Sequence, residues 1–220
     1  MMLADELAAF RQTFMTKAPP EIRDAMARAD LALDGSGIAE RAAKAGDVAP
    51  DFELPDARGR SVHLSNLLAD GPVVVSFYRG GWCPYCNLEL RALQMAEPRF
   101  RELGASLVAV SPQTPDESLS TSEKNALTFA VLSDVGSFAA KRFGIAFDLA
   151  EELRPIYAKF GHALPDKNGD DSWVLPLPAT YVIDQDGTIA LAFVDIDYRC
   201  RLEPADIIAV LETLALERAA

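Results

Sequence analysis

Two kinds of hydrophobic pattern alternate along the central part of the chain. Apolar runs rich in β-branched residues cover residues 73–78 and 105–111, and a shorter run covers residues 128–132. Such runs are typical of buried strands. Stretches with apolar residues at helical spacing begin near residues 84 and 116. This alternation predicts an α/β fold with a central mixed β-sheet and helices on both faces.

The first 45 residues carry a helical pattern only. Phe10 and Phe14 belong to one apolar face, and Met26 belongs to a second face after a proline break. No residue in this segment indicates catalytic chemistry. We therefore predict an N-terminal helical extension over residues 1–45 and a domain over residues 46–220. These apolar faces should pack on the domain or on a second subunit, and we expect a homodimer that uses them.

Shorter patterns complete the set of elements. Alternating apolar and polar residues predict a β-hairpin over residues 45–65, and helical spacing predicts a helix over residues 149–160. Residues 161–173 are polar and rich in Asp and Gly, which predicts an exposed loop. Residues 174–195 predict a hairpin around an Asp-Gly turn, and residues 204–218 predict a C-terminal amphipathic helix.

The strongest chemical signal follows the first apolar run, in the stretch Arg79-Gly-Gly-Trp-Cys-Pro-Tyr-Cys86. Cys83 and Cys86 lie where a strand leads into a helix, and Pro84 suits a first helical position. The N-terminus of a helix stabilises a thiolate and lowers the pKa of a thiol. Arg79 adds a second positive charge nearby. The pattern indicates a reactive thiol with a resolving thiol one helical turn away.

Structural interpretations of the same pair remain open. A zinc site would need further Cys or His ligands close in the sequence, and Cys200, His63 and His162 are all distant. The pair could also form a permanent structural disulfide, or it could consist of two inert buried thiols. We predict no metal and no organic cofactor.

Composition limits the classes of partner and compartment. The formal net charge of −12 argues against nucleic acid and against anionic membrane surfaces. The chain has no apolar run of about 18 residues and no basic, apolar leader at its N-terminus. Three cysteines, two of them in one redox-type motif, fit a reducing cytoplasm better than a disulfide-stapled secreted domain. We therefore expect a cytoplasmic protein.

The motif also resembles known proteins. Trp82-Cys-Pro-Tyr-Cys86 after a hydrophobic strand is similar to a thioredoxin-fold active site with a glutaredoxin-like Cys-Pro-Tyr-Cys motif. Upstream, Gly46-Asp-Val-Ala-Pro-Asp-Phe-Glu-Leu54 and the later pair Phe77-Tyr78 resemble the alkyl hydroperoxide reductase/thiol-specific antioxidant family, the peroxiredoxins. This resemblance implies a thioredoxin-like fold and an antioxidant thiol peroxidase.

A second stretch, Leu177-Pro-Ala-Thr-Tyr-Val-Ile-Asp184, resembles the strand that a cis proline precedes in thioredoxin-like proteins. The resemblance implies that Pro178 is cis and lies against the active-site disulfide. A trans proline at the start of a strand is the alternative. We predict that Arg79, Trp82 and Pro178 support and bind the substrate.

The peroxiredoxin pattern is only partly present, which leaves two assignments of the thiols. Alignment on the aromatic pair places Arg79 at the family's proline, Cys83 at its Thr or Ser, and Cys86 at its peroxidatic cysteine. The family's arginine falls at Pro178. In the first assignment, the thioredoxin register, Cys83 is the nucleophile and Cys86 is the resolving thiol. In the second, the peroxiredoxin register, Cys86 attacks the peroxide and Cys83 is the resolving thiol. We favour Cys86, and both registers end in a Cys83–Cys86 disulfide.

We therefore predict a thiol-dependent peroxidase that reduces hydrogen peroxide or organic hydroperoxides through a cysteine sulfenic acid. An external thiol donor of thioredoxin, glutaredoxin or glutathione type would reduce the disulfide. The alternatives are a dithiol–disulfide oxidoreductase that acts on proteins and a redox-sensing module without turnover. Cys200 has polar neighbours; a distant resolving thiol is one interpretation, and we expect it to be incidental. Glu89 stands where the family has a Glu, which suggests a packing or hydrogen-bonding role.

Overall fold

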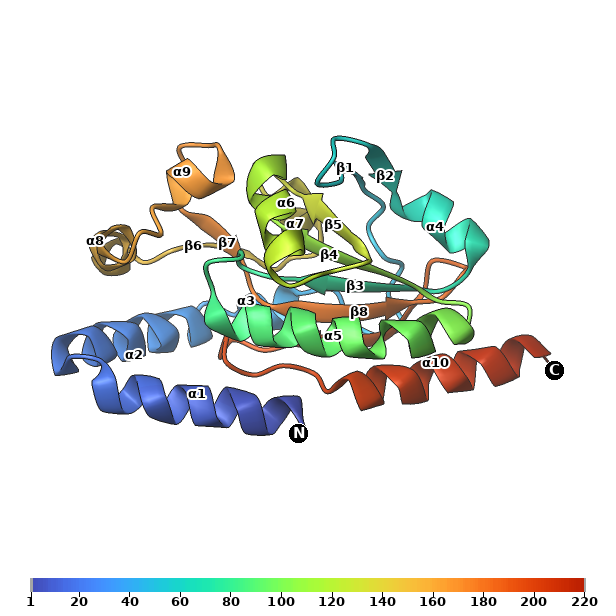
Figure 1. Ribbon diagram of the computed structural model, residues 1–220, viewed down its shortest axis with the longest axis horizontal. Helices are drawn as coiled ribbons and strands as arrows, with labels where there is room; N and C mark the ends of the chain where they lie inside the picture. The colour runs from blue at the N-terminus through green and yellow to red at the C-terminus, as the bar shows by residue number, and fades with distance from the viewer. Residues whose placement is uncertain (1, 220) are drawn as a thin grey trace.

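A five-stranded mixed sheet forms the centre of the computed structural model, which describes residues 2–219 (Figure 1). The strands lie in the order β5-β4-β3-β8-β9, and all neighbours are antiparallel except the parallel pairs β3–β4 and β4–β5. Their bounds are β3 Val73–Phe77, β4 Ser106–Ser111, β5 Ala130–Ser133, β8 Ala179–Ile183 and β9 Ile189–Val194. The predicted α/β fold with a mixed sheet is confirmed.

Helices cover both faces of this sheet. On one face lie α5 and α10, with α6 beside α5, and on the other lie α4 and α7. Their bounds are α4 Leu64–Asp70, α5 Pro84–Glu102, α6 Pro115–Lys124, α7 Phe138–Arg142 and α10 Pro204–Ala219. Among the described residues, no helix is long and apolar enough to cross a membrane.

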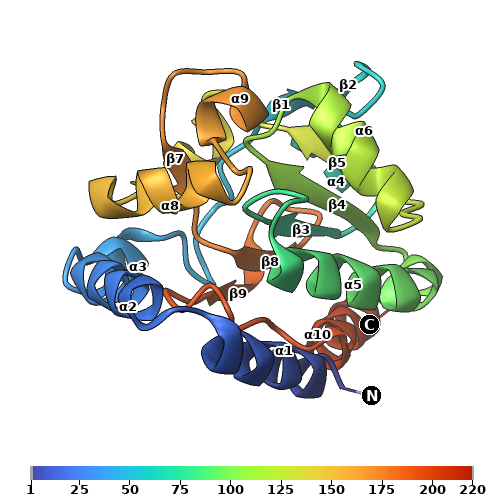
Figure 2. The same ribbon diagram turned by 60° about the vertical axis from the view of Figure 1, so that its left-hand side comes forward.

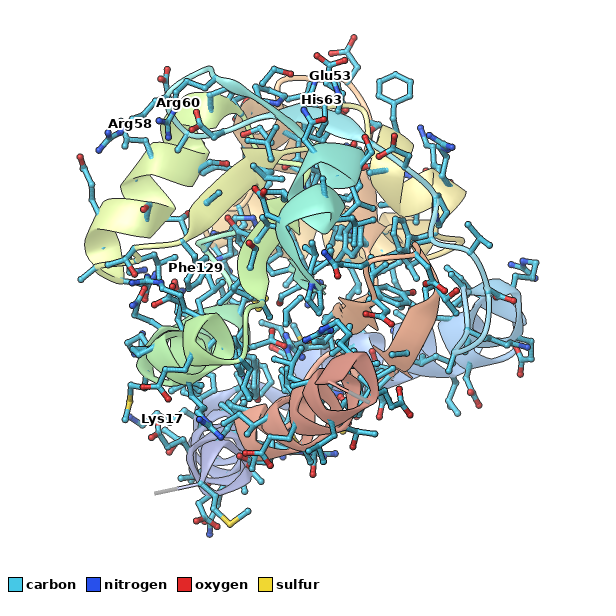
Figure 3. The ribbon with its side chains drawn as sticks, turned by 90° about the vertical axis from the view of Figure 1, so that its right-hand side faces the viewer. Lys17, Glu53, Arg58, Arg60, His63 and Phe129 are labelled. Atoms are coloured by element: carbon cyan, nitrogen blue, oxygen red, sulfur yellow. The ribbon has the colours of Figure 1, made fainter. Side chains whose placement is uncertain are left out.

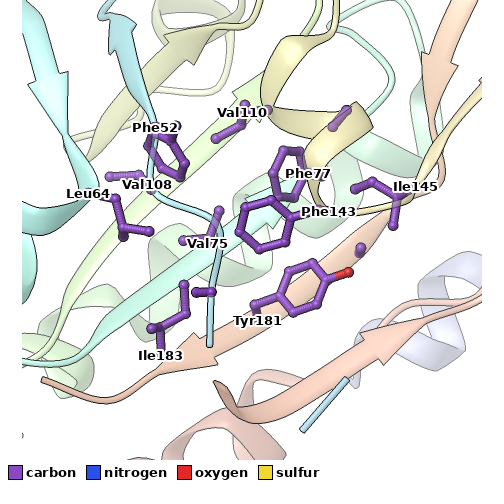
Figure 4. Packing of buried hydrophobic residues seen from close by; sticks show 14 of the residues in the cluster. Phe52, Leu64, Val75, Phe77, Val108, Val110, Phe143, Ile145, Tyr181 and Ile183 are labelled. Atoms are coloured by element: carbon purple, nitrogen blue, oxygen red, sulfur yellow. The ribbon is translucent and has the colours of Figure 1, made fainter. Parts of the chain in front are cut away.

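Strand β3 joins the two hydrophobic cores because successive side chains point to opposite faces of a sheet. Val75 and Phe77 enter one core, where the ring centroid of Phe77 lies 5.0 Å from that of Phe143 (Figure 4). Val74 and Tyr78 enter the other core, under α5 and α10. All five residues of the strand are buried. Burial on both faces explains why the sequence of β3 is a continuous apolar run.

A short hairpin precedes the sheet, as predicted. Its strands, β1 Glu53–Pro55 and β2 Ser61–His63, are antiparallel, and Figure 3 shows Glu53 and His63 side by side across the pair. The buried carboxylate of Asp56 accepts hydrogen bonds from the backbone N–H groups of Arg58 and Arg60 and closes the turn. The hairpin also gives His63 a partner, because His63 Nε2 lies 3.3 Å from Glu53 Oε1.

The N-terminal extension forms three helices, α1 Leu3–Lys17, α2 Pro20–Asp34 and α3 Ile38–Arg41. Figure 2 shows α1 beside α5 and α10, and Leu3 and Leu7 enter the same core as these helices. The apolar residues expected at a dimer interface therefore pack on the chain's own domain. Met26 is buried, and Phe10 and Phe14 are half-buried. A homodimer stays a prediction, but this packing removes the physical reason given for it.

Two local predictions are wrong, and a third is confirmed only in part. The expected loop over residues 161–173 contains α9 Leu164–Asn168, which forms because Leu164 is fully buried. The expected helix over 149–160 is divided into a 3₁₀ turn and α8 Arg154–Lys159, since Pro155 lacks the N–H that a continuous helix needs. The hairpin predicted over residues 174–195 is confirmed in β8 and β9, which pair antiparallel on either side of the Asp-Gly turn. Strand β7 Val174–Pro176 lies outside this hairpin and pairs with β6 Ala146–Asp148.

Candidate active site

Both motif cysteines lie at the start of α5, where β3 has just ended. Cys83 is the residue that precedes the helix, Pro84 is its first residue and Cys86 lies in its first turn. Both cysteines are free thiols with side chains almost wholly buried. The predicted position at a strand-to-helix junction is confirmed. At this junction the unpaired N–H groups and the positive end of the helix macrodipole favour an anionic sulfur.

A relay of amide side chains holds the loop that carries these cysteines. The Gly81 N–H donates to Gln113 Oε1 at 2.7 Å, and Asn87 Nδ2 donates to the Gly81 and Cys83 carbonyls at 2.8 and 2.9 Å. Asn125 Nδ2 in turn donates to Asn87 Oδ1 at 2.8 Å. These buried groups satisfy one another, so they rigidify the loop. No pattern in the sequence indicates these amides as a group, because each comes from a different element.

Arg79 is buried beneath this loop without an acidic partner. Its guanidinium donates to the Tyr157 hydroxyl and lies 4.3 Å from the Tyr198 ring centroid and 5.3 Å from that of Trp82. Among the described residues, no carboxylate lies within ion-pair distance of it. A buried charge is costly unless it is compensated. Aromatic faces compensate it in part, and a thiolate at Cys83 supplies the missing negative charge.

A second arginine lies beside Cys86. Arg201 Nε donates to Glu89 Oε2 at 2.6 Å, and its Nη2 lies 3.4 Å from Cys86 Sγ. The side chains of Arg201 and Glu89 are only 1% and 2% exposed. Burial raises the pKa of Glu89 to about 7, although the Arg201 charge opposes the rise. A hydrogen-bonding role was expected for Glu89, whereas no pattern indicated Arg201, which lies 115 positions from Cys86.

Replacing Glu89 with alanine is expected to lower the free energy of unfolding by about 3–5 kcal/mol, because it leaves the Arg201 charge buried and unpaired. Glu102→Ala is the control on the same helix. Its ion pair with Arg99 is exposed, so the loss should stay below about 1 kcal/mol. Urea unfolding measures both changes. Equal losses of unfolding free energy in the two variants would show that the buried Glu89–Arg201 pair stabilises the fold no more than the exposed pair does.

The two thiols differ in their readiness to ionise. Burial alone would raise the pKa of Cys83, but a hydrogen bond from Cys86 and the positive charges of Arg79 and Arg201 outweigh it, and the pKa falls to about 6. Burial raises the pKa of Cys86, and the neighbouring Cys83 thiolate raises it further. Cys83 is therefore the thiol of the pair that ionises more readily.

Cys83 lines a cavity with a volume of about 160 Å³, and Cys86 is not part of the wall of that cavity. The N-terminal helices contribute Phe10, Phe14 and Met26 to its wall. Trp82 also lines it, stacked on His162 with ring centroids 5.1 Å apart. The structure thus brings Trp82 and Arg79 together around Cys83. Their role in binding the substrate stays a prediction. The cavity wall also includes three residues of the N-terminal extension and His162. No role was predicted for His162.

The prediction for Pro178 is wrong in its central feature. The peptide bond before Pro178 is trans, and the described residues contain no cis peptide bond. The chain is extended on both sides, because Pro176 still pairs with Ala146 and the Leu177 N–H donates to the Ile145 carbonyl. A trans bond continues this extended path into β8. Pro178 lines a second, larger cavity, which Arg79 also lines.

The remaining cysteine has a different environment. Cys200 is half-buried, and burial together with the charge of Asp195 raises the pKa of its thiol. Its carbonyl accepts a hydrogen bond from Arg201 Nη1 at 2.8 Å. The backbone carbonyl of Cys200, and not its sulfur, therefore holds Arg201, the arginine that contacts Cys86. No group of three or more His, Cys, Asp or Glu side chains among the described residues is arranged to hold a metal ion.

A mixed sheet flanked by helices, with a Cys-x-x-Cys pair between a central strand and a helix, defines the thioredoxin-like class of thiol-redox proteins. The chain belongs to the AhpC/TSA family, whose model matches residues 45–192. It is accordingly a thiol-dependent peroxidase of the peroxiredoxin type, an oxidoreductase. The matched segment begins after the N-terminal helices.

Relatives support this assignment. Peroxiredoxin Q, chloroplastic, of Sedum lineare is 30% identical over 148 residues, which are 67% of each chain. A Mycobacterium tuberculosis protein assigned to the peroxiredoxins is 35% identical over 113 residues, 51% of this chain and 73% of that one. The crystal structure of peroxidoxin BcpB from Mycobacterium tuberculosis matches with a TM-score of 0.61 and 27% identity, covering 77% of this chain and 97% of the other.

Proposed function

We propose that Cys83 is the thiolate that attacks the hydroperoxide and that Cys86 is the resolving thiol. One observation carries the proposal: Cys83 combines a lowered pKa with a position in the wall of a cavity, whereas Cys86 has a raised pKa and does not line that cavity. A thiolate is the nucleophilic form of cysteine. This assignment departs from the preference for Cys86 that the alignment of motifs suggested.

The proposed reaction has two chemical steps. The Cys83 thiolate attacks one peroxide oxygen, the O–O bond breaks, and the leaving oxygen takes up a proton and departs as an alcohol or as water. Cys83 is then a sulfenic acid. The Cys86 sulfur attacks the Cys83 sulfur, water leaves, and a Cys83–Cys86 disulfide forms. An external thiol donor returns two electrons and two protons to the pair.

The residues around the pair fit these steps. Arg79 lies on the side of the Cys83 cavity and favours both the thiolate and negative charge on the leaving oxygen. Arg201 contacts Cys86 and favours its deprotonation when it attacks. Trp82 and Tyr157 cover the guanidinium and exclude water from it. The site needs no metal or organic cofactor for this chemistry.

We also propose the cellular setting that this chemistry requires. The donor is a thiol of thioredoxin, glutaredoxin or glutathione type, and a reducing compartment such as the cytoplasm provides it. Residues 1–45 act as an extension that covers the site of the domain over 46–220. A homodimer would have to use surfaces other than the faces of α1 and α2 that pack on the domain.

Oxidation of the reduced protein tests the proposed disulfide. One equivalent of hydrogen peroxide is expected to remove two thiols per chain and to link Cys83 to Cys86, because the two sulfurs face each other across one helical turn. Peptide mass spectrometry after alkylation identifies the link. A dominant disulfide that contains Cys200 would overturn the two-residue resolving model.

A dithiol–disulfide oxidoreductase is the second candidate, because a low-pKa thiol ahead of its resolving partner is the arrangement expected in a thioredoxin register. The N-terminal helices argue against it, since Phe10, Phe14 and Met26 narrow the access to Cys83. Reduction of insulin disulfides without peroxide, at a rate comparable to peroxide turnover, would favour this second activity.

A further inference from the structure

Two N-terminal helices form part of the wall of the Cys83 cavity, although they lie outside the segment that matches the family. Phe10 and Phe14 come from α1, and Met26 comes from α2. The side chain of Cys83 is only 2% exposed. Access to its sulfur therefore depends on side chains that the family segment does not supply.

Contacts at several points fix both helices on the domain. Leu3 and Leu7 are buried in the core that contains α5 and α10. The Glu203 carboxylate accepts a hydrogen bond from the Leu3 N–H at 3.3 Å, at the start of α1. In α2, Asp30 forms an ion pair with Arg199 at 2.8 Å. The two helices are therefore a docked part of the fold and stand permanently beside Cys83.

The size of the cavity limits which thiols can approach the Cys83 sulfur. Its volume of about 160 Å³ is room for about five water molecules at ~30 Å³ each. A thiol of a few heavy atoms fits into such a space. A protein thiol brings its surrounding backbone with it, and Phe10 and Phe14 stand in the way of that backbone. The rate of thiol–disulfide exchange depends on access to the sulfur that is attacked.

Reduction of the disulfide starts at Cys83, because Cys83 lines the cavity and Cys86 does not. A donor thiolate attacks the Cys83 sulfur, the S–S bond breaks, and Cys86 leaves with the electron pair and takes up a proton. Arg201 Nη2 lies 3.4 Å from Cys86 Sγ and favours this leaving thiolate. A second donor thiolate then attacks the donor sulfur of the mixed disulfide. Cys83 returns as a thiolate, and the two donor molecules leave as their own disulfide.

Oxidation leaves Arg79 without a negative neighbour. In the reduced protein a Cys83 thiolate compensates the Arg79 charge, whereas the disulfide is neutral. The Arg79 side chain is 3% exposed, and its Nε–H has no hydrogen-bond partner among the described residues. A buried charge is costly unless it is compensated, and a carboxylate is a strong partner for a guanidinium. An anionic donor is therefore favoured in the oxidised state.

We propose that a small thiol that carries a carboxylate reduces the Cys83–Cys86 disulfide, and that α1 and α2 exclude protein dithiols from it. The proposal rests on the disulfide of the peroxidase reaction described above and names the donor class for that disulfide. Arg79 supplies the preference for negative charge, and Phe10 and Phe14 supply the limit on size. The limit on size is accordingly a property of this chain's own extension.

The preference for charge is tested on protein oxidised with diamide, so that the result does not require peroxide turnover. Two thiols of similar size and opposite charge, 3-mercaptopropionate and cysteamine, reduce the disulfide, and monobromobimane labelling follows the reaction. Each rate constant is divided by that of the same thiol with bis(2-hydroxyethyl) disulfide, which corrects for the different reactivity of the two thiols.

The corrected rate constant of 3-mercaptopropionate should exceed that of cysteamine by about tenfold, because opposite charges attract strongly at a partly buried site. The ratio should fall to near one in Arg79→Met and stay unchanged in the control Arg99→Met. The net charge of −12 would by itself favour cysteamine, so the overall field cannot produce the expected order. Equal corrected constants in the wild type would overturn the proposal.

A bacterial thioredoxin tests the exclusion of protein donors. Phe10→Ala combined with Phe14→Ala should raise the rate constant of reduction by thioredoxin about tenfold, because the two side chains no longer limit access. The rate constant of 3-mercaptopropionate should stay close to that of the wild type. Thr13→Ala combined with Thr16→Ala, on the exposed side of α1, is the matched control and should change neither value.

A second variant, Glu203→Gln, weakens the fixation of α1 and replaces the double variant if that protein does not fold by circular dichroism. Equal rate constants for thioredoxin in the wild type and in the opened variant would overturn the proposal. Lack of turnover with peroxide, alongside the expected pattern of donors, would overturn the peroxidase reaction and leave the selection of donors intact.

Discussion

Replacing Cys83 with serine is expected to reduce peroxide turnover by about a thousandfold or more, because the nucleophile itself is lost. Cys86→Ser should behave differently. Its Cys83 keeps the Arg79 charge and the cavity, so it should react once and accumulate sulfenic acid, since no resolving thiol remains. A dimedone-type probe and mass spectrometry report the sulfenic acid after one equivalent of hydroperoxide.

The two single variants separate the two registers, and Cys200→Ser serves as the control that should react like wild type. In the opposite assignment, Cys83→Ser would form the sulfenic acid at Cys86 and Cys86→Ser would react slowly. Trapping of the probe at Cys86 in the Cys83→Ser protein would therefore falsify the assignment of Cys83 as nucleophile. The result does not depend on the identity of the physiological donor.

Local patterns in the sequence were sufficient for the elements that carry the thiols. The run over residues 73–78 is apolar because both faces of β3 are buried, and the breaker residues after it mark the start of α5. The position of Cys83 and Cys86 follows from this junction alone. The alternation of strands and helices likewise gave the mixed sheet, although the division into β7 and β8 at Pro178 did not follow from it.

Contacts between distant segments were not predictable from one sequence. Arg201 lies in the segment before α10 and contacts Cys86 and Glu89. Its neighbours in the sequence are polar and do not indicate that its side chain is buried against these residues. The apolar faces around Phe10 and Met26 were correctly predicted, but a periodic face does not show whether the same chain or another copy covers it. For Pro178, resemblance suggested cis, whereas the pairing of β6 with β7 favours an extended trans path.

Charge at Arg79 should control the pH dependence of the reaction. The folded-state pKa of Cys83 is lowered to about 6, so the thiolate fraction and the alkylation rate should rise with pH and reach half of their maximum near pH 6. Arg79→Met removes a charge that lowers this pKa, so the midpoint should move upward. A shift of one unit would cut the thiolate fraction at pH 6 by about fivefold.

The measurement uses the Cys200→Ser background, so that labelling by monobromobimane reports the motif thiols only. Arg99→Met is the control, because Arg99 lies on the exposed side of α5 and pairs with Glu102 and Glu212. Its midpoint should match that of the parent protein. If Arg79→Met also left the midpoint unchanged, the helix N-terminus, the Cys86 hydrogen bond and Arg201 would suffice to stabilise the thiolate. Arg79 would then act on the bound peroxide alone, which a fall in kcat/KM at pH 8, where Cys83 is ionised in the parent protein, would reveal.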